Sequence, residues 1–264
     1  MVIIMNILIT GATSGIGYAL TKELIKKGHY VYLCVHKKNQ IPTVNSKLKE
    51  IDYQDRVSII KLDITRKEDI EMIEKLDIDC LVNLAAIGIG GSLLNLNIND
   101  IKENFEVNLF GTLNITKKYI ETRKNKKGKV LITSSIAGIL PIPFLGSYCA
   151  TKASLITFAK TLHKELKKTN LNINIKLVIP GAYKTGFNQI MIENKEVLNN
   201  EIFKKDINKI IEKEKIIFSL IEKKRLNSVV NKMIKAIESE NNKLTYKTPI
   251  IQALVAKIYT LLKE

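Results

Sequence analysis

The stretch NILITGATSGIG, residues 6–17, joins a short apolar run directly to a cluster of glycines. Residues 6–10 have the continuous apolar character of a strand that is buried on both faces of a sheet. Glycines between a strand and a helix permit a tight turn and let the backbone approach a phosphate, which the helix N-terminus attracts. The spacing Gly11-x-x-x-Gly15-x-Gly17 differs from the common G-x-G-x-x-G, and glycine clusters also serve turns and tight helix packing.

Outward from this stretch, short apolar runs alternate with amphipathic helical stretches. Strands are expected at 6–10, 30–35, 57–63, 80–85, 129–135 and 173–180, and helices at about 15–27, 67–76, 98–118 and 148–167. This alternation is typical of a parallel sheet covered by helices on both faces. We therefore predict one α/β domain over residues 1–264, a doubly wound parallel sheet that binds ligands at the carboxyl ends of its strands.

The sequence changes in character after Thr185. Residues 187–240 are rich in Lys, Glu, Asn and Ile, contain no glycine or proline, and predict two or three amphipathic helices. We expect a helical lid over the ligand crevice, with charged outer faces. Its apolar positions suggest a hydrophobic substrate but suit packing equally well; they are Ile190, Ile192, Val197, Ile202 and Phe203.

The last stretch, residues 248–264, predicts an amphipathic helix that begins with Thr248 before Pro249. Its apolar residues fall along one face; they are Ile250, Ile251, Leu254, Val255, Ile258, Leu261 and Leu262. We expect this face to pack on the lid or on a neighbouring subunit. Contact with a membrane surface is the less favoured alternative.

The net charge of +16, from 42 basic and 26 acidic residues, raises the possibility of a nucleic-acid partner. Only four of the basic residues are arginines, the side chain that best recognises bases and phosphates, and the lysines are scattered. We therefore expect no nucleic-acid role. Three cysteines cannot all pair, no signal peptide is recognisable, and no apolar run could span a membrane, so we expect a cytoplasmic protein.

The end of the second expected strand indicates which dinucleotide the protein prefers. Sites that prefer NAD carry an acidic residue there, whereas this chain has Val35 followed by His36 and Lys37. A 2′-phosphate would be attracted by those side chains, so NADP(H) is favoured over NAD(H); the alternative is a merely solvated loop in a lysine-rich protein. Asp63, after the third strand, is expected to accept from the adenine amino group, and Ala85 to face the adenosine ribose.

The stretch SYCATKASL, residues 147–155, places Tyr148 and Lys152 one helix turn apart. An ammonium beside a phenol favours the phenolate and lowers the pKa of the tyrosine. A general acid–base works best with a pKa near the operating pH, so the pair predicts a catalytic Tyr148. The alternative is an ordinary surface pair.

Six motifs together resemble the short-chain dehydrogenase/reductase family: TGATSGIG, LVNLAA, VNLFGT, ITSSIAG, YCATK and VIPGAYKT, spanning about residues 5–185. The combination is specific in a way that no single motif is. It implies a Rossmann-type domain and an NAD(P)-dependent oxidoreductase that interconverts a carbonyl and a secondary alcohol, without a metal. It also implies a homodimer or homotetramer built on the helices that carry Asn108 and Tyr148.

The same resemblance implies the catalytic set Asn108, Ser135, Tyr148 and Lys152. Tyr148 would donate a proton to the carbonyl oxygen as hydride arrives from the nicotinamide, and Ser135 would hydrogen-bond the same oxygen. Ser134 is the weaker serine candidate. Lys152 would bind the nicotinamide ribose, and Asn108 would hold a water that links Lys152 to solvent.

The cofactor-binding residues implied by the resemblance lie after the first, second, third, fourth and sixth strands and on the Tyr148 helix. They are Thr10, Gly11, Ser14, Gly15, Ile16, Gly17, His36, Lys37, Asp63, Ile64, Asn83, Ala85, Tyr148, Lys152, Pro180, Gly181, Tyr183 and Thr185. The backbone near Tyr183 and the Thr185 hydroxyl would contact the carboxamide.

Two departures from the family pattern concern cofactor affinity: Tyr183 replaces an aliphatic residue, and NLAA at 83–86 replaces Asn-Asn-Ala-Gly. A catalytically silent dinucleotide-binding regulator on the same fold is the alternative function, and its mark would be the loss of a catalytic residue. A sugar-nucleotide epimerase shares the Tyr–Lys pair but usually has a different glycine spacing and a larger C-terminal domain.

Overall fold

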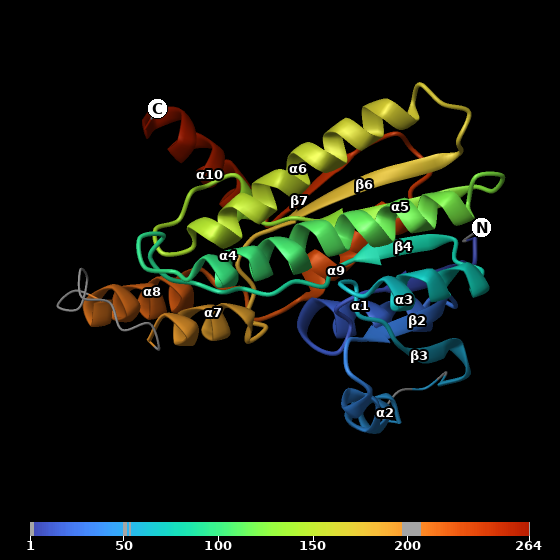
Figure 1. Ribbon diagram of the computed structural model, residues 1–264, viewed down its shortest axis with the longest axis horizontal. Coiled ribbons are helices and arrows are strands. Elements are labelled where there is room, and N and C mark those ends of the chain that lie inside the picture. Colours follow the sequence, from blue (N-terminus) through green and yellow to red (C-terminus); the bar gives the residue numbers. More distant parts are fainter. Residues whose placement is uncertain (1–2, 50–51, 53, 197–206, 264) are drawn as a thin grey trace.

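The computed structural model describes residues 3–49, 52, 54–196 and 207–263. Its centre is a parallel sheet in the order β3-β2-β1-β4-β5-β6-β7. The strands are β1 Asn6–Ile9, β2 Tyr30–Val35, β3 Val57–Lys61, β4 Cys80–Asn83, β5 Gly128–Thr133, β6 Ile173–Pro180 and β7 Thr245–Thr248. The predicted doubly wound parallel sheet is confirmed (Figure 1), and β7 is an additional edge strand that the sequence did not reveal.

Helices follow most of the strands. The α-helices are α1 Gly15–Lys26, α2 Ile41–Leu48, α3 Lys67–Glu71, α4 Ile98–Phe105, α5 Thr112–Thr122, α6 Gly146–Leu166, α7 Phe187–Glu196, α8 Ile207–Ile221, α9 Asn227–Glu238 and α10 Ile250–Lys263. Short 3-10 turns are η1 Lys38–Gln40, η2 Gln54–Arg56, η3 Met72–Lys75 and η5 Ile136–Gly138, and a π-helical turn, η4 Glu106–Gly111, joins α4 to α5. The single helix expected at 98–118 is therefore interrupted by a widened turn.

Both faces of the sheet are buried, which explains the continuous apolar strands. Along β1, Ile7 and Ile9 enter one hydrophobic cluster while Leu8 enters the other. The first cluster is closed by α1, α2 and α9, and the second by α3, α5 and α6. A strand flanked on both sides has no solvent face, so its sequence does not alternate.

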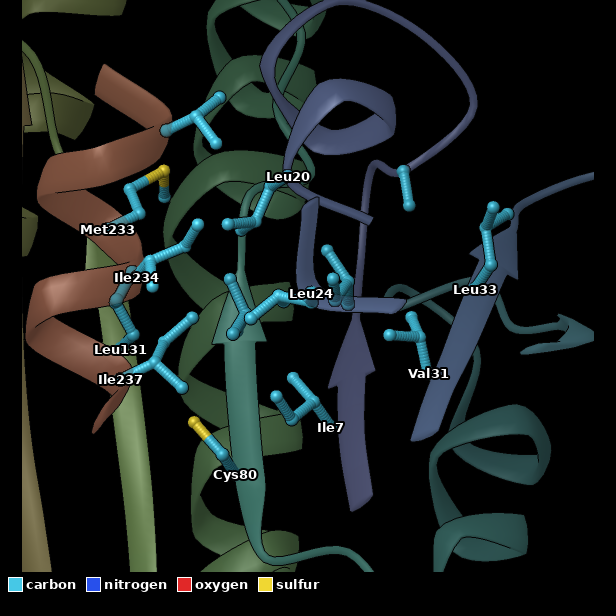
Figure 2. Packing of buried hydrophobic residues seen from close by; sticks show 14 of the residues in the cluster. Ile7, Leu20, Leu24, Val31, Leu33, Cys80, Leu131, Met233, Ile234 and Ile237 are labelled. Carbon is cyan, nitrogen blue, oxygen red and sulfur yellow. The ribbon is translucent and has the colours of Figure 1, made fainter. Parts of the chain in front are cut away.

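Helix α9 belongs to the core, which corrects part of the predicted lid. Met233 and Ile237 are fully buried, and Ile234 is nearly so. Figure 2 shows these three side chains directed toward Leu131 of β5 and Leu24 of α1. The segment contains two kinds of helix, because α9 closes a face of the sheet whereas α7 and α8 lie beyond its carboxyl edge (Figure 1). Residues 197–206, with Val197, Ile202 and Phe203, lie outside the described residues.

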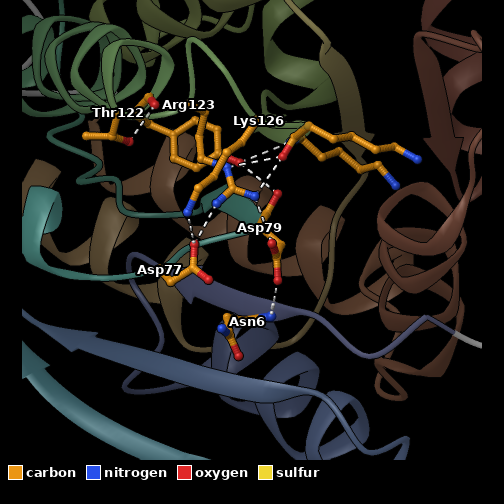
Figure 3. A network of polar contacts seen from close by, with 9 residues as sticks. Asn6, Asp77, Asp79, Thr122, Arg123 and Lys126 are labelled. Carbon is orange, nitrogen blue, oxygen red and sulfur yellow. Dashed lines mark hydrogen bonds and ion pairs between the residues drawn. The ribbon is translucent and has the colours of Figure 1, made fainter.

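The amino ends of three strands are fixed by Arg123, which follows α5. Its guanidinium donates to Asp77 Oδ1 at 2.7 Å and to Asp79 Oδ1 at 2.8 Å, and it also donates to the carbonyl of Lys127 (Figure 3). Asp79 in turn accepts from the backbone N–H of Asn6 at 2.9 Å. A buried, two-pronged guanidinium thus ties the starts of β1, β4 and β5 together.

Two lysines of the sheet interior donate hydrogen bonds to carbonyl groups at the end of α9 and in the turn after it. Lys129 of β5 donates to the carbonyl of Ile237, and Lys176 of β6 donates to the carbonyls of Asn241 and Lys243. These contacts satisfy carbonyls that a helix end and the turn after it leave without partners. Burial lowers the pKa of Lys176 to about 8. Among the described residues, no helix is long and apolar enough to cross a membrane.

The core position of α9 gives the first prediction. Met233→Ala should lower the free energy of unfolding by about 2–5 kcal/mol, because it leaves a cavity between α9 and the sheet. A urea titration followed by circular dichroism measures this. Lys235→Ala, at an exposed position of the same helix, is the control and should change stability by less than about 0.5 kcal/mol. Equal small effects of both variants would contradict the assignment of α9 to the core.

Candidate active site

The glycine loop after β1 can only be built with glycine at two positions. Gly11 has a φ of +66°, and a Cβ there would lie 2.7 Å from the Cα of Ala85. A Cβ at Gly17 would lie 2.3 Å from the carbonyl oxygen of Gly11. Thr10 fixes the loop from below, since its Oγ1 accepts from the backbone N–H groups of Leu84 and Ala85 at 3.1 and 3.2 Å. The structure therefore brings Thr10, Gly11 and Ala85 together at the ends of β1 and β4.

The start of α1 is open to an anion. Ser14 is the N-cap, and its side chain makes no capping hydrogen bond, so the first amides of α1 keep their donors for another acceptor. Gly15 follows with a φ of +51°, and Ile16 packs against the core. Close backbone approach together with a free helix N-terminus fits the pyrophosphate of a dinucleotide.

Asp63 and Ile64 follow β3 and differ in the groups that they offer to a ligand. The carboxylate of Asp63 accepts from the backbone N–H of Thr65 at 3.0 Å and from its hydroxyl at 2.7 Å. Burial, the largest single cause, raises the pKa of Asp63, but the Thr65 hydrogen bonds with Lys61 and His36 outweigh it and hold the pKa below its usual value. Asp63 is thus an ionised acceptor, as its expected role requires, whereas Ile64 is buried against Gly111 and offers only its backbone.

The Asn83 side chain points away from the crevice. Its Nδ2 donates to Thr116 Oγ1 on α5 at 3.1 Å. Its Oδ1 is buried and has no hydrogen-bond partner among the described residues. The predicted role of Asn83 in cofactor binding therefore falls to its backbone, which leads into the Leu84–Ala85 contact with Thr10.

His36 and Lys37 are exposed at the end of β2, and a third cation that sequence reasoning missed lies near the glycine loop. Lys47 of α2 places its Nζ 3.5 Å from the carbonyl of Thr13 and 5.8 Å from the centre of the Tyr18 ring. Tyr18 Oη donates back to the carbonyl of Lys47 at 2.8 Å. Lys47 was not identifiable from the sequence, because lysines are scattered along the chain and α2 was not among the predicted helices.

Helix α6 carries Tyr148 and Lys152, and β5 ends beside it with Ser134 and Ser135. Ser134 Oγ donates to the backbone carbonyl of Lys152 at 2.7 Å, and a Cβ at Gly138 would lie 2.6 Å from the same carbonyl group. Ser134 is thereby committed to holding α6 in place. Ser135 is the N-cap of η5, where its Oγ accepts from the N–H of Ala137 at 3.2 Å, and it interacts with Tyr148.

Tyr148 and Lys152 lie together and are both almost inaccessible to solvent. Lys152 Nζ is 5.5 Å from the centre of the Tyr148 ring and donates to the carbonyl of Thr133 at 3.4 Å. Burial lowers the pKa of Lys152 to about 8. Burial also raises the pKa of Tyr148, although Ser135 acts in the opposite direction. The net direction for Tyr148 is contrary to the lowering expected from the lysine, because desolvation of the phenolate is the larger effect.

Tyr148 is buried by the start of α7. The Phe187 ring lies 5.8 Å from the Tyr148 ring, tilted by 49°. Phe187 and Met191 belong to one apolar cluster with Tyr148. A Cβ at Gly88 would lie 2.3 Å from Met191 Cγ, so α7 also packs closely on the chain after β4. Sequence reasoning placed a lid here but did not identify these contacts.

Asn108 is fully buried in the π-helical turn. Its Oδ1 accepts from the N–H of Ile87 at 2.8 Å, while its Nδ2 donates to the carbonyl of Ile87 at 2.9 Å and to Thr151 Oγ1 at 3.2 Å. Both amide hydrogens are engaged within the protein, so the predicted water would have to donate to an oxygen of Asn108. The side chain also holds the chain after β4 to α6, and the water relay stays a prediction.

Asn104 repeats this arrangement one turn earlier, and sequence reasoning missed it. It accepts from the N–H of Ile89 at 3.2 Å and donates to the Ile89 carbonyl and to Ser147 Oγ, both at 3.0 Å. The sequence does contain a matching pattern. Asn104 and Asn108 are four residues apart, and so are their hydroxyl partners, Ser147 and Thr151.

The loop after Pro180 meets the glycine loop. A Cβ at Gly15 would lie 3.0 Å from the Cβ of Thr185, and the N–H of Gly181 donates to the carbonyl of Thr248 at 2.7 Å. Tyr183 is buried, with its hydroxyl 2.8 Å from Ser228 Oγ and 3.0 Å from Thr248 Oγ1. Tyr183, which replaces an aliphatic residue of the family pattern, therefore adds hydrogen bonds beneath the loop and does not fill the crevice.

The family model described as short chain dehydrogenase matches residues 5–196. The chain belongs to the short-chain dehydrogenase/reductase family. It is 30% identical over 262 residues to a probable short-chain type dehydrogenase/reductase, VdlC, of Helicobacter pylori, covering 96% of this chain and 92% of the relative. As a member of this family it is an NAD(P)-dependent oxidoreductase.

Solved structures of family members share the fold. A short-chain dehydrogenase/reductase from Burkholderia phymatum in complex with NAD matches with a TM-score of 0.81 at 20% identity, covering 96% of this chain and 92% of that one. One from Burkholderia cenocepacia in complex with NADP gives 0.70 at 22% identity, covering 98% and 95%. Relatives of this fold thus bind either dinucleotide.

The burial of Tyr148 by Phe187 can be tested directly. Phe187→Ala should lower the pKa of Tyr148, because it removes part of the desolvation that raises this pKa. An ultraviolet absorbance titration measures tyrosine ionisation, and the same titration of Tyr148→Phe identifies the Tyr148 component. Phe110→Ala, at a half-exposed ring outside this cluster, should leave the component unchanged. An unaltered Tyr148 transition in Phe187→Ala would show that α7 does not control it.

Proposed function

We propose that this member of the short-chain dehydrogenase/reductase family prefers NADP(H) and interconverts a hydrophobic carbonyl compound and its secondary alcohol. It would act in the cytoplasm as a homodimer or homotetramer, with no nucleic-acid partner. One observation carries the chemistry: Ser135, Tyr148 and Lys152 lie together where β5 and α6 meet, at the same edge of the sheet as the glycine loop.

The residues suit reduction of a carbonyl. When bound, the nicotinamide supplies or accepts the hydride. Tyr148, whose raised pKa keeps it protonated at neutral pH, donates its proton to the carbonyl oxygen, and Ser135 donates a hydrogen bond to the same oxygen as charge develops on it. Lys152, whose Nζ lies 5.5 Å from the centre of the Tyr148 ring, then stabilises the resulting phenolate by its charge. The alcohol product then dissociates, and the Tyr148 phenolate must regain a proton before the next cycle.

An apolar pocket supports the hydrophobic substrate. It has a volume of about 670 Å³ and lies between the chain at 92–94, the chain at 137–146 and α6. Ala137 and Cys149 line this pocket and also belong to the cluster around Tyr148. Tyr148 itself does not line the pocket, so a substrate held at Tyr148 would have to extend past Cys149 to place its apolar part there. Apolar side chains form most of its wall, including Leu93, Ile139, Ile142 and Phe144.

The basic side chains around the adenosine end support the NADP(H) preference. His36, Lys37 and Lys47 lie in or near the loops that frame the ends of β1 and β2. Residues 35–38 include no acidic residue, so this loop offers a 2′-phosphate positive charge and no carboxylate of its own.

Helices α4 and α6 support the proposed oligomer. Thr157 of α6 is exposed, with Ile156 beside it half-buried. Phe110, in the turn after α4, is 49% exposed. A second copy could cover these positions, and equilibrium sedimentation would measure the resulting mass.

Substitutions at the two serines separate chemistry from structure. Ser135→Ala should lower kcat by about 10²–10³-fold, because a hydrogen bond to the developing oxyanion is lost. Tyr148→Phe should lower it by about 10²–10⁴-fold. NADPH absorbance with a panel of apolar ketones and aldehydes measures both. Ser134→Ala, which breaks the bond to α6, should mainly lower the melting temperature.

This assay also decides between the enzyme and a silent regulator. The burial of Tyr148 beneath Phe187 and Met191 is the observation that favours a regulator. Tight NADPH binding without turnover of any member of the panel would support the regulator. Turnover that survives in Tyr148→Phe would contradict the catalytic assignment.

Cofactor preference is tested at the adenosine end. Lys37→Ala and Lys47→Ala should each raise KM for NADPH by about tenfold, the value of one charge-assisted hydrogen bond, and leave KM for NADH unchanged. Initial rates with both dinucleotides measure this. Lys26→Ala, a lysine at the far end of α1, is the matched control. Equal effects on NADPH and NADH would refute a 2′-phosphate site.

A further inference from the structure

Helix α10 presents its large apolar side chains to solvent. Its exposed fractions are 67% for Ile250, 75% for Ile251, 56% for Leu254, 59% for Val255 and 46% for Ile258. Among the α10 residues whose side chains the structure describes, the buried ones are small, Ala253 and Ala256; the side chains of Leu261 and Leu262 lie outside the described residues. The expectation that the apolar face packs on the lid is therefore wrong within one chain. A surface of this kind marks an interaction site when it is contiguous.

The last turns of α8 carry a second set of exposed apolar side chains. Ile216, Ile217, Leu220 and Ile221 are 60, 53, 79 and 39% exposed. Gln252 of α10 donates from Nε2 to the carbonyl of Ile221 at 2.8 Å, so the two helices meet there. Both lie at the end of the molecule away from the N terminus (Figure 1). We call these four residues of α8 and the five of α10 the apolar end.

Cations surround the apolar end. Lys223, Lys224 and Arg225 follow α8 directly, and Lys184 is hydrogen-bonded through its backbone N–H to the carbonyl of Lys223; all four side chains are exposed. The neighbouring acid, Glu222, is turned inward, where it accepts from Asn188 Nδ2 at 2.6 Å and from Gln189. The rim of the apolar end is therefore positive.

We propose that the apolar end docks into the surface of a bilayer that contains anionic lipids. Aliphatic side chains on a helix that lies along the interface enter the boundary of the acyl chains, and flanking lysines and arginines bind anionic headgroups. The charge pattern disfavours a second copy as the occupant. A two-fold interface places the same patch on both subunits, so Lys223, Lys224 and Arg225 of one copy would approach those of the other. Glu212 is the one exposed acid among the described residues of α8.

Docking is coupled to the active site through Gln252. Its Oε1 accepts from the N–H of Ala182 at 2.8 Å, and Gly181 leaves no room for a Cβ beside it, at 2.0 Å. The loop that is expected to contact the nicotinamide thus rests on the docking helix. Helix α10 also contacts η5, whose Ala137 and Gly138 line the apolar pocket. Docking would bring that pocket to the membrane, a step that rests on the proposed hydrophobic substrate.

Vesicle flotation of the full chain tests docking without cofactor or substrate. The probes are vesicles of phosphatidylcholine alone and of phosphatidylcholine with phosphatidylglycerol, at low and physiological salt. We expect flotation with the anionic vesicles, weakened by salt. Ile251→Gln and Leu254→Gln should each weaken vesicle partitioning by about tenfold, because each withdraws one aliphatic side chain from the bilayer. Both positions are exposed, so the fold should tolerate the change.

The matched control is Ile3→Gln, an isoleucine with 62% exposure near the N terminus, which should float like the parent. Absence of flotation with anionic vesicles at either salt concentration would overturn the proposal, as would equal flotation of parent and Leu254→Gln. A change from dimer to monomer in Leu254→Gln, in a parent that does not float, would identify a second copy as the occupant. NADPH turnover in solution is measured separately, so failure of docking and failure of the proposed enzyme are distinguishable.

Discussion

A single hydrogen bond, from the Ser134 hydroxyl to the backbone carbonyl of Lys152, holds the catalytic helix against the sheet. It joins the end of β5 to the middle of α6, and Gly138 permits the two to approach closely. Lys152 and Tyr148 then point to the same side of the helix, next to Ser135. Because the contact uses a backbone carbonyl, it fixes the height of α6 whichever side chains the helix carries.

The C-terminal part of the chain supports the same edge of the sheet from the other side. Helix α9 closes the core, β7 extends the sheet, and Tyr183 binds Ser228 and Thr248 beneath the loop after β6. Helices α7 and α8 lie outside this support. Phe187 and Met191 of α7 therefore cover Tyr148 without being part of the core that holds it, which is what a covering element over a binding crevice requires.

The sequence was sufficient for the parallel sheet, because strands buried on both faces leave continuous apolar runs, and for the glycine loop, because Gly11 and Gly17 have no substitute. It was insufficient for β7, whose TYKT sequence has no apolar run. The burial of α9 was missed because amphipathic helices look alike whether they cover a sheet or a crevice. The pKa direction of Tyr148 required the position of α7, and the role of Asn108 required the path of the chain at Ile87.

The Arg123 network lies at the edge of the sheet opposite to the catalytic residues. The amino ends of the strands therefore stabilise the sheet, and their carboxyl ends carry the site. Arg123, Asp77 and Asp79 hold three strands together at the amino ends, so substitutions in the loops at the carboxyl ends need not destabilise the sheet. Descendants of such a protein can acquire new substrates through changes in the loops at the carboxyl ends of the strands alone.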